Sequence, residues 1–409
     1  MNYFSKIFRQ TFWQVLGKAA TSISTFIILG LIARNYGEAG TGVFTLALTY
    51  LAIFYLLADF GFNAHVLRRV KDRDLEIKIE WQKLLGTRIL WSLVLVILAV
   101  SLLPLWPFAT SDFTKAVIIG SPAIIFSGVF ITCNLFFQSK LRYDLSVLAV
   151  GLGTVGSLTL FLFFSLKKYP VSSLVFAHLI GWIIIAFFAW VLIRKFIFNI
   201  FPVFDIKYAL SLFKQSWLIA ATLALNVLYF RADAFLISYF RTPFDVGVYN
   251  VAYSVFQSAL VLPTFIMNSY YPLMLKSFGN IKYVGLSLLG LSFFGTFFTL
   301  VFAPLVIEVL TGGGFAGSVQ SLQILSLGFP AYFLSSLFMW IFIAKGKYKE
   351  MFLLYTSGLF LNLILNFLYI PKYSFLAASW VTVISEYFIL LIQIFLIYNG
   401  TRKRNHLKK

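Results

Sequence analysis

The sequence contains one cysteine, Cys133, among 409 residues. A single cysteine has no partner for a disulfide within the chain and cannot build a cysteine-based metal site. Only three histidines are present, and His178, near the outer end of an apolar run, has no companion that would make it a metal ligand. We therefore expect no disulfide framework, no metal centre and no cofactor.

Charged residues are also scarce, at 11% of the chain, and the longest hydrophilic segment, residues 65–84, is only about 20 residues long. A folded soluble domain needs roughly 50 residues or more, so the chain has no room for a fused ATPase. The sequence has no GxxxxGK[ST] phosphate-binding loop, and the TGGG cluster at residues 311–314 lacks the lysine that such a loop needs. We expect TGGG to form a turn.

Apolar residues dominate the remainder. The chain is 60% hydrophobic and 19% aromatic, with a mean hydropathy of +0.90, far above that of a soluble protein. A membrane-spanning helix needs roughly 20 mostly apolar residues, whereas a spanning β-barrel shows alternating runs of about ten. The apolar runs here are continuous and of helical length. We predict an all-α polytopic membrane protein that is not an enzyme.

Twelve spans can be drawn along the chain. They cover residues 12–34, 42–64, 85–104, 116–138, 145–166, 172–193, 213–240, 247–272, 283–305, 320–344, 350–370 and 376–398.

Lysine and arginine sort by side of the membrane. If the N-terminus is cytoplasmic, 24 of the 33 basic residues fall on the cytoplasmic side and six on the other. Because positive loops are retained in the cytoplasm, both termini are predicted to lie inside. The net charge of +19 is therefore better explained by contact with anionic membrane lipid than by binding of nucleic acid.

Short motifs recur with an offset of about 204 residues. FRQTFW at residues 8–13 matches FKQSW at 213–217, and GVFTLA at 42–47 matches GVYNVA at 247–252. The offset relates the first six spans to the last six, and six is even, so both copies enter the membrane in the same direction. We predict two six-helix lobes related by a pseudo-twofold axis along the membrane normal. The N-terminal lobe is residues 1–200, the C-terminal lobe residues 201–398, and a basic cytoplasmic tail residues 399–409.

A polar stripe follows one face of the first span and of its counterpart, because the polar residues are three or four apart. It contains Gln14, Lys18, Ser22 and Thr25 in one copy and Asn226, Tyr229 and Asp233 in the other. Gln257 continues a similar face on the next span. Polar side chains inside a membrane avoid lipid, so the stripes line either a water-filled lumen or a set of interhelical hydrogen bonds.

Five of the charged residues inside the predicted spans are candidates for a binding site or a buried ion pair. Arg231 and Asp233 project about 200° apart on a regular helix and are not expected to pair. Arg231 then needs either a bent helix or a buried acidic partner, for which Glu386 is the first choice. Glu386 lies near the membrane midplane, where a carboxyl suits either proton binding or such a pair. Asp59 is expected to pair with Lys18.

Longer motifs carry a resemblance to a known family. GLIARNYGEAGTGVF at residues 30–44, ADFGFN at 58–63, LTGGGFAGSVQSLQIL at 310–325 and LNLILNFLYIPKYSFLAASWVTVISE at 361–386 resemble the polysaccharide flippases of the multidrug, oligosaccharidyl-lipid and polysaccharide exporter (MOP) superfamily. The likeness is strongest to O-antigen and capsule flippases of the bacterial inner membrane.

The resemblance implies that undecaprenyl-pyrophosphate-linked oligosaccharide moves from the cytoplasmic to the periplasmic leaflet by alternating access. The first two spans of each lobe would line the cavity, with Lys18 and Arg231 as candidates for binding anionic phosphate or acidic sugar. Asp233, Asp59 and Glu386 are candidates for binding a coupling ion, H⁺ or Na⁺. Polysaccharide polymerases and glycosyltransferases of lipopolysaccharide biosynthesis would be its partners.

Two alternatives remain at this stage. A cation-coupled multidrug exporter of the same fold would need several acidic residues in the lumen, whereas the candidates here are mixed in sign. A membrane enzyme, such as an O-antigen polymerase or a lipid-dependent glycosyltransferase, would need a sizeable outer loop or paired carboxylates, and the outer loops are short.

Overall fold

The computed structural model describes residues 3–63, 65–66, 74–106, 110–140, 142–197, 201–277 and 279–406. Within these ranges, the side chains that are not described are those of residues 3–12, 14–15, 74–77, 218, 222–228, 268–269, 271–273, 275–276, 348 and 398–406. The described residues contain α-helices and one short 3-10 helix, and no strand. They divide into two compact units, residues 1–227 and 228–409, and the division falls inside one helix, α8. The predicted lobe boundary at residue 200 stays a prediction.

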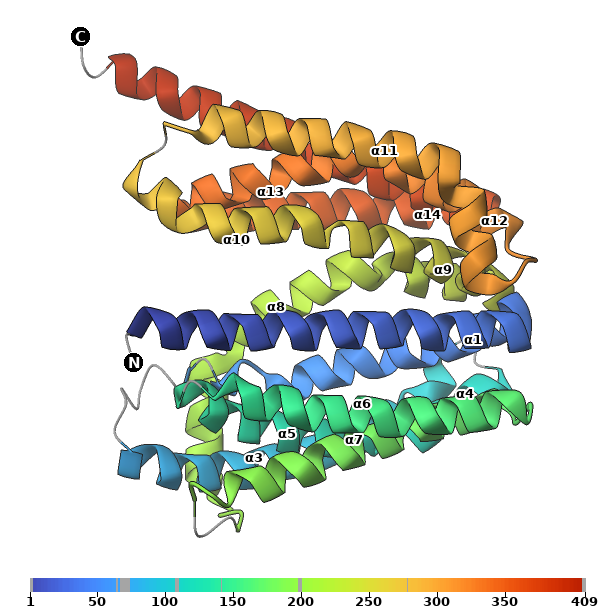
Figure 1. The fold of residues 1–409 in the computed structure, drawn as a ribbon, viewed down its shortest axis with the longest axis vertical. Coiled ribbons are helices and arrows are strands. Elements are labelled where there is room, and N and C mark those ends of the chain that lie inside the picture. Colours follow the sequence, from blue (N-terminus) through green and yellow to red (C-terminus); the bar gives the residue numbers. More distant parts are fainter. Residues whose placement is uncertain are drawn as a thin grey trace. The chain divides into compact units, whose positions relative to one another are not determined.

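The N-terminal unit is a bundle of long helices. It contains α1 (Tyr3–Asp59), α3 (Asp74–Ser101), η1 (Leu103–Leu105), α4 (Ser111–Gly120), α5 (Ala123–Ser139), α6 (Tyr143–Leu166), α7 (Val171–Ile193) and the first part of α8 (Ile206–Phe240). Helix α1 reverses direction at Gly37, whose φ of 63° and ψ of −167° are not helical, so its two legs run side by side (Figure 1). Glycine tolerates this conformation because it has no Cβ.

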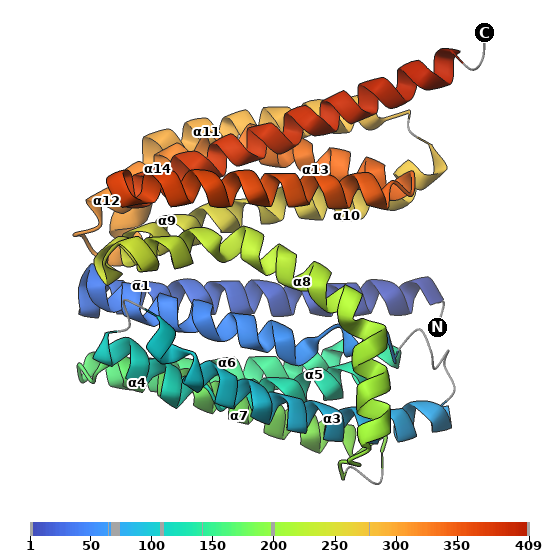
Figure 2. The same ribbon diagram turned by 180° about the vertical axis from the view of Figure 1, so that it is seen from behind.

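Aromatic and aliphatic side chains from several helices fill the core of this unit. Phe62, Trp81, Phe136 and Phe137 are buried there, and Trp81 Nε1 donates a hydrogen bond of 2.9 Å to the carbonyl oxygen of Thr132. The first turns of α8 cross α3 instead of running along it (Figure 2). Phe213 on those turns packs edge-on against Trp91 of α3, with ring centroids 4.9 Å apart.

The C-terminal unit contains the rest of α8 and six further helices. These are α9 (Pro243–Ala259), α10 (Val261–Lys276), α11 (Ile281–Thr311), α12 (Ala316–Ser326), α13 (Phe329–Ala344) and α14 (Tyr348–His406). The α9 helix begins with a capping box, in which Thr242 and Asp245 satisfy each other's backbone N–H groups. The α14 helix reverses at Ser374, which has a positive φ of 52° and donates a hydrogen bond of 2.6 Å to Asp245.

Two sequence features act as expected in this unit. Pro263 lacks a backbone N–H, and the helix is interrupted at Leu260, between α9 and α10, within one turn of the proline. The TGGG cluster forms a turn: Gly312 caps the end of α11 with a φ of 77°, and Gly313 and Gly314 also have positive φ values. The predicted TGGG turn is confirmed.

Eight of the described helices are long and apolar enough to cross a membrane, and α12 with α13 form one further bent pair, at 46°. The prediction of an all-α polytopic membrane protein is therefore confirmed. Two of the eight, α1 and α14, contain the reversals at Gly37 and Ser374, in the short loops predicted at residues 35–41 and 371–375. The count of twelve spans and the pseudo-twofold symmetry stay predictions.

Candidate functional site

The C-terminal unit holds a buried carboxylate, Asp233 on α8, that is 3% exposed. One of its oxygens, Oδ2, accepts hydrogen bonds from Tyr249 Oη of α9 at 2.7 Å and from Thr382 Oγ1 of α14 at 2.9 Å. The other oxygen, Oδ1, accepts from Asn366 Nδ2 of α14 at 2.6 Å. Three donors on two other helices therefore surround one acidic group.

The reversal of α14 at Ser374 builds this site. Asn362 and Asn366 precede the reversal and lie one turn apart, and Asn366 Nδ2 also donates to Asn362 Oδ1 at 2.9 Å. Thr382 follows the reversal, so the two legs of α14 approach Asp233 from different sides. Without the turn at Ser374, residues 16 apart on one straight helix would lie about 24 Å apart and could not meet.

The site offers oxygen atoms. Asn366 Oδ1 is buried and has no hydrogen-bond partner among the described residues, and the Asp233 carboxylate, Asn362 Oδ1 and Thr382 Oγ1 lie in the same cluster. Oxygen ligands suit a proton or a hard cation, whereas softer metals prefer sulfur and imidazole. No group of three or more His, Cys, Asp or Glu side chains that could hold a metal ion occurs in the described part of the chain.

A second buried carboxyl, Glu386, is also 3% exposed. It lies one turn beyond Thr382 on α14, and it accepts a hydrogen bond from Tyr229, which lies one turn before Asp233 on α8. The hydroxyl of Tyr332 on α13 also contacts it. The two helices thus carry two polar contacts on successive turns, Asp233 with Thr382 and Tyr229 with Glu386.

The predicted partnership of Arg231 with Glu386 is wrong. Tyr229 donates a hydrogen bond to the Glu386 carboxyl, and the described residues contain no ion pair of Arg231. The helix explains the difference, because Tyr229 and Asp233 are four apart and share the face toward α14, whereas Arg231 is two residues from each and projects elsewhere. The expectation that Arg231 and Asp233 do not pair agrees with the partners found for Asp233.

The other predicted residues of this unit are less informative. Gln257 is half-buried on α9, one turn beyond Tyr253, and the ring of Tyr253 stacks on that of Tyr249 with centroids 5.5 Å apart. Asn226 and Gln14, which were both predicted to face the cavity, lie outside the residues whose side chains are described.

In the N-terminal unit, the polar stripe of α1 is more exposed. Lys18 and Thr25 are exposed and Ser22 is half-buried. Thr25 Oγ1 donates 2.9 Å to the carbonyl oxygen of Thr21 on its own helix. A neighbouring side of α1 packs on α6, where a Cβ on Gly17 would lie 2.9 Å from Val147.

The predicted pair of Lys18 and Asp59 is also wrong. Asp59 instead contacts Arg88 of α3, with Nη2 to Oδ1 at 3.3 Å. The guanidinium of Arg88 is fully buried and also donates to the carbonyl oxygens of Ala58 and Asp59, which end α1. Its remaining hydrogen bonds go to Asn63 Oδ1 and Thr132 Oγ1. Arg88 therefore caps the C-terminal end of α1.

Sequence reasoning missed several of these residues. Asn362 and Asn366 are polar residues four apart in an otherwise apolar run, which is the signal that could have placed them on one helix face. No comparable signal marks Tyr249, since the chain has 21 tyrosines and most need no special partner.

Comparison with solved structures finds the same fold in membrane transporters. A structure described as lipid II flippase MurJ in an inward closed conformation is 18% identical, with a TM-score of 0.73 over 94% of this chain and 87% of that chain. An inward-facing multidrug resistance MATE family transporter of the MOP superfamily is 14% identical, with a TM-score of 0.69 over 95% of each chain. A MOP superfamily transporter from Pyrococcus furiosus is 14% identical, with a TM-score of 0.61 over 99% of this chain and 96% of that chain.

Identities this low show a shared fold and nothing finer. No curated protein matches the sequence. The model of a family described as polysaccharide biosynthesis protein matches residues 7–278, which is more than half of the chain. The chain is a multi-pass membrane protein with the fold of MOP superfamily transporters, and it belongs to the polysaccharide biosynthesis protein family.

Proposed function

We propose that the protein is a flippase. It moves an undecaprenyl-pyrophosphate-linked oligosaccharide, an O-antigen or related repeat unit, from the cytoplasmic to the periplasmic leaflet of the inner membrane by alternating access. Membership of the polysaccharide biosynthesis family and the transporter fold support this proposal. The physical task suits the fold, because a pyrophosphate and a hydrated sugar chain cannot cross hydrocarbon unaided, while the lipid tail can stay in the bilayer.

The Asp233 cluster is the observation that supports a cation gradient as the driving force for transport. Ionisable residues inside membrane-spanning segments mark ion pathways and proton relays, and Asp233 is a buried carboxylate inside a predicted span. The sequence has no phosphate-binding loop for nucleotide hydrolysis. Transport is then driven by a cation, H⁺ or Na⁺, that binds at Asp233.

Lys18 and Arg231 are the candidates for the anionic head group. Lys18 is exposed on α1 and Arg231 is half-buried on α8, so neither ammonium nor guanidinium is enclosed by its own unit. Arginine offers bidentate hydrogen bonds to phosphate, while lysine offers a point charge.

Reconstituted proteoliposomes test the coupling. A fluorescent lipid-linked oligosaccharide is placed in one leaflet, and its appearance in the other is measured with and without a proton or sodium gradient. The rate of flipping by wild-type protein should increase with one of the gradients. The Asp233→Asn variant should flip the labelled lipid at the same slow rate with and without that gradient. Asp112→Asn, on α4 of the other unit, is the control and should behave as wild type. A wild-type rate that ignores both gradients would remove the coupling proposal.

Deletion of the gene tests the substrate class. Loss of surface polysaccharide that is restored by an O-antigen flippase of known function supports lipid-linked oligosaccharide as the substrate. Unchanged polysaccharide together with increased sensitivity to amphipathic cations would favour the second candidate, a cation-coupled multidrug exporter. The structural likeness to a multidrug resistance MATE family transporter is the observation that favours this second candidate.

A further inference from the structure

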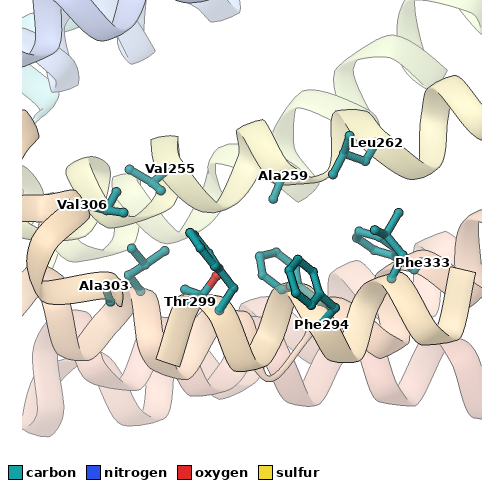
Figure 3. Close-up of a pocket in the computed structure, with 13 residues that line it drawn as sticks. Val255, Ala259, Leu262, Phe294, Thr299, Ala303, Val306 and Phe333 are labelled. Carbon is teal, nitrogen blue, oxygen red and sulfur yellow. The ribbon is translucent and has the colours of Figure 1, made fainter. Parts of the chain in front are cut away.

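The C-terminal unit contains an apolar cavity of about 290 Å³ (Figure 3). None of the residues that line it belongs to the Asp233 cluster. Helices α9 to α13 contribute its walls. Among the described residues that line it, Thr299 has the only polar side chain. A cavity with so few hydrogen-bonding groups does not hold water well, because a buried water needs two to four polar partners.

Small residues and a broken helix create the space. Ala259 ends α9 directly before the interruption at Leu260, and Gly295 and Ala303 lie on the facing side of α11. A Cβ added to Gly295 would lie 3.7 Å from the ring of Phe329, which is ordinary van der Waals contact. The cavity therefore results from missing side-chain volume on both walls.

The cavity opens sideways through exposed apolar side chains. Phe294 and Phe298 of α11 are 65% and 45% exposed, and Leu262 of α10 is 48% exposed, whereas Phe329 and Phe333 on the inner wall are each 2% exposed. The mouth residues belong to helices that are long and apolar enough to cross a membrane. Exposed apolar side chains on such helices are expected to face hydrocarbon.

The cavity is elongated along α11. Its lining on that helix recurs every three or four residues from Leu291 to Val306, which at about 1.5 Å per residue spans roughly 22 Å. The labelled side chains in Figure 3 follow the same direction. A lipid chain in a bilayer runs along the same direction as a spanning helix, and the groove is long enough to cover the roughly 15 Å that one leaflet contributes to the hydrocarbon core.

We propose that this groove binds one acyl chain of a bilayer phospholipid. Shape, apolar lining and lateral opening match a hydrocarbon chain, and sugar or pyrophosphate would find no donors there. Filling the groove restores the van der Waals contacts that an empty apolar void lacks. The bound chain contacts α9, α10 and α11 at once, and so it stabilises the region around the break at Leu260. This inference is independent of the proposed transport substrate.

Photocrosslinking tests the proposal. Wild-type protein in phospholipid nanodiscs receives a trace of phospholipid with a diazirine in one acyl chain, and the crosslinked peptides are identified by mass spectrometry. We expect crosslinks concentrated in residues 291–306. Gly295→Phe fills the groove and should reduce these crosslinks at least about tenfold.

Gly290→Phe is the matched control on the same helix. Gly290 is exposed and a Cβ there meets nothing within 4 Å. The Gly290→Phe variant should therefore give as many crosslinks in residues 291–306 as wild type. Ala259→Leu fills the groove from the opposite wall and should reproduce the loss if Gly295→Phe fails to fold in a thermal melt. Equal crosslinking in the filled and control variants would show nonspecific annular lipid and overturn the proposal. Preferential capture of a diazirine-labelled polyprenyl lipid over the phospholipid would overturn it as well.

Discussion

Arg88 shows that the partner of a buried charge is decided by a helix end as much as by an opposite charge. Its guanidinium makes five hydrogen bonds, and only one of them reaches a carboxylate oxygen. The others satisfy carbonyl and neutral side-chain oxygens around the end of α1. Such carbonyls would otherwise be left without donors, which costs about 1–3 kcal/mol for each buried group.

Arg88→Lys should therefore destabilise the protein by about 3 kcal/mol, because lysine keeps the charge but cannot form the fork of hydrogen bonds. Asp59→Asn should cost less than about 1 kcal/mol, since an amide oxygen still accepts and the side chain is 33% exposed. Unfolding in detergent micelles measures both. Equal losses would mean that the Asp59 ion pair, and not the capping of α1, is the main contribution.

Asp205, which lies outside the spanning helices, makes the stability of the fold depend on pH. Its carboxylate accepts from Lys83 Nζ at 2.8 Å and, as the cap of α8, from the backbone N–H of Tyr208 at 3.0 Å. The Lys83 ammonium, and then the backbone N–H of Tyr208, hold the pKa of Asp205 below its ordinary value. The contact therefore stabilises the fold above the unfolded pKa of about 3.9, and this stabilisation is lost as pH falls through the lower folded pKa.

The melting temperature of Asp205→Asn should accordingly be lower than that of wild type at pH 7, and the difference should shrink when both are measured at pH 3. Lys83→Met should remove most of the effect of Asp205→Asn at pH 7, because the two residues act as a pair. A difference between wild type and Asp205→Asn that is the same at both pH values would contradict the assignment.

The residues of the candidate site were only partly predictable. Asp233 and Glu386 stand out as acidic residues in apolar runs, and their burial follows from that context. Their partners did not follow, because Asn366 and Thr382 meet Asp233 only through the reversal of α14 at Ser374, and a predicted loop at residues 371–375 does not say which faces of its two flanking helices meet α8. Lys18 and Arg231 were paired by sign alone, which ignores the hydroxyl and carbonyl groups that compete for a buried charge.

At the scale of elements, the approach of α8 to α3 depends on one glycine. The segment before α8 lies so close to α3 that a Cβ on Gly86 would be 2.2 Å from the carbonyl oxygen of Val203. The backbone N–H of Val203 donates 3.0 Å to the carbonyl oxygen of Gln82. A side chain at position 86 would push this backbone away from α3.

Gly86→Ala should therefore destabilise the fold by about 2 kcal/mol or more, through overpacking against backbone that cannot rotate away. Gly151→Ala is the control, because it lies inside α6 with nothing within 4 Å of the added Cβ. It should be neutral or stabilise by about 0.5–1 kcal/mol. Thermal melts of both variants distinguish the close approach from a general cost of replacing glycine.

The sequence predicts that the long apolar runs form α-helices and where these helices lie along the chain, because continuous apolar runs of this length cross a membrane as α-helices. The interruption at Leu260 was readable, because Pro263 stands three residues after it. The divisions of the predicted spans 116–138 and 320–344 were not foreseen. The first lies at Pro122 and the second at residues 327–328 before Pro330, where the ring of each proline removes a backbone donor at the start of the next helix.

At the scale of the whole molecule, the distribution of lysine and arginine predicts that both termini are cytoplasmic. The single cysteine makes this testable, because Cys133 is fully buried and should not react. In intact cells, a membrane-impermeant maleimide should label Lys167→Cys but not Lys345→Cys. Both positions are exposed, so permeabilised cells should show labelling of both. Labelling of Lys345→Cys in intact cells would reverse the predicted topology.

A half-turn of the side-chain amide of Asn366 would change what the candidate site offers. Its nitrogen donates to both Asp233 and Asn362, while its oxygen has no partner in the described part of the chain. Half a turn about χ2 exchanges the nitrogen and the oxygen with almost no change in shape. In the observed orientation, the amide nitrogen donates to the acceptor oxygens of Asp233 and Asn362. In the other orientation, amide oxygens would lie beside the Asp233 carboxylate. Such a group of acceptors is favourable only when a cation binds to it. Admission of an ion at Asp233 would then require the rotation of one side chain and no displacement of a helix.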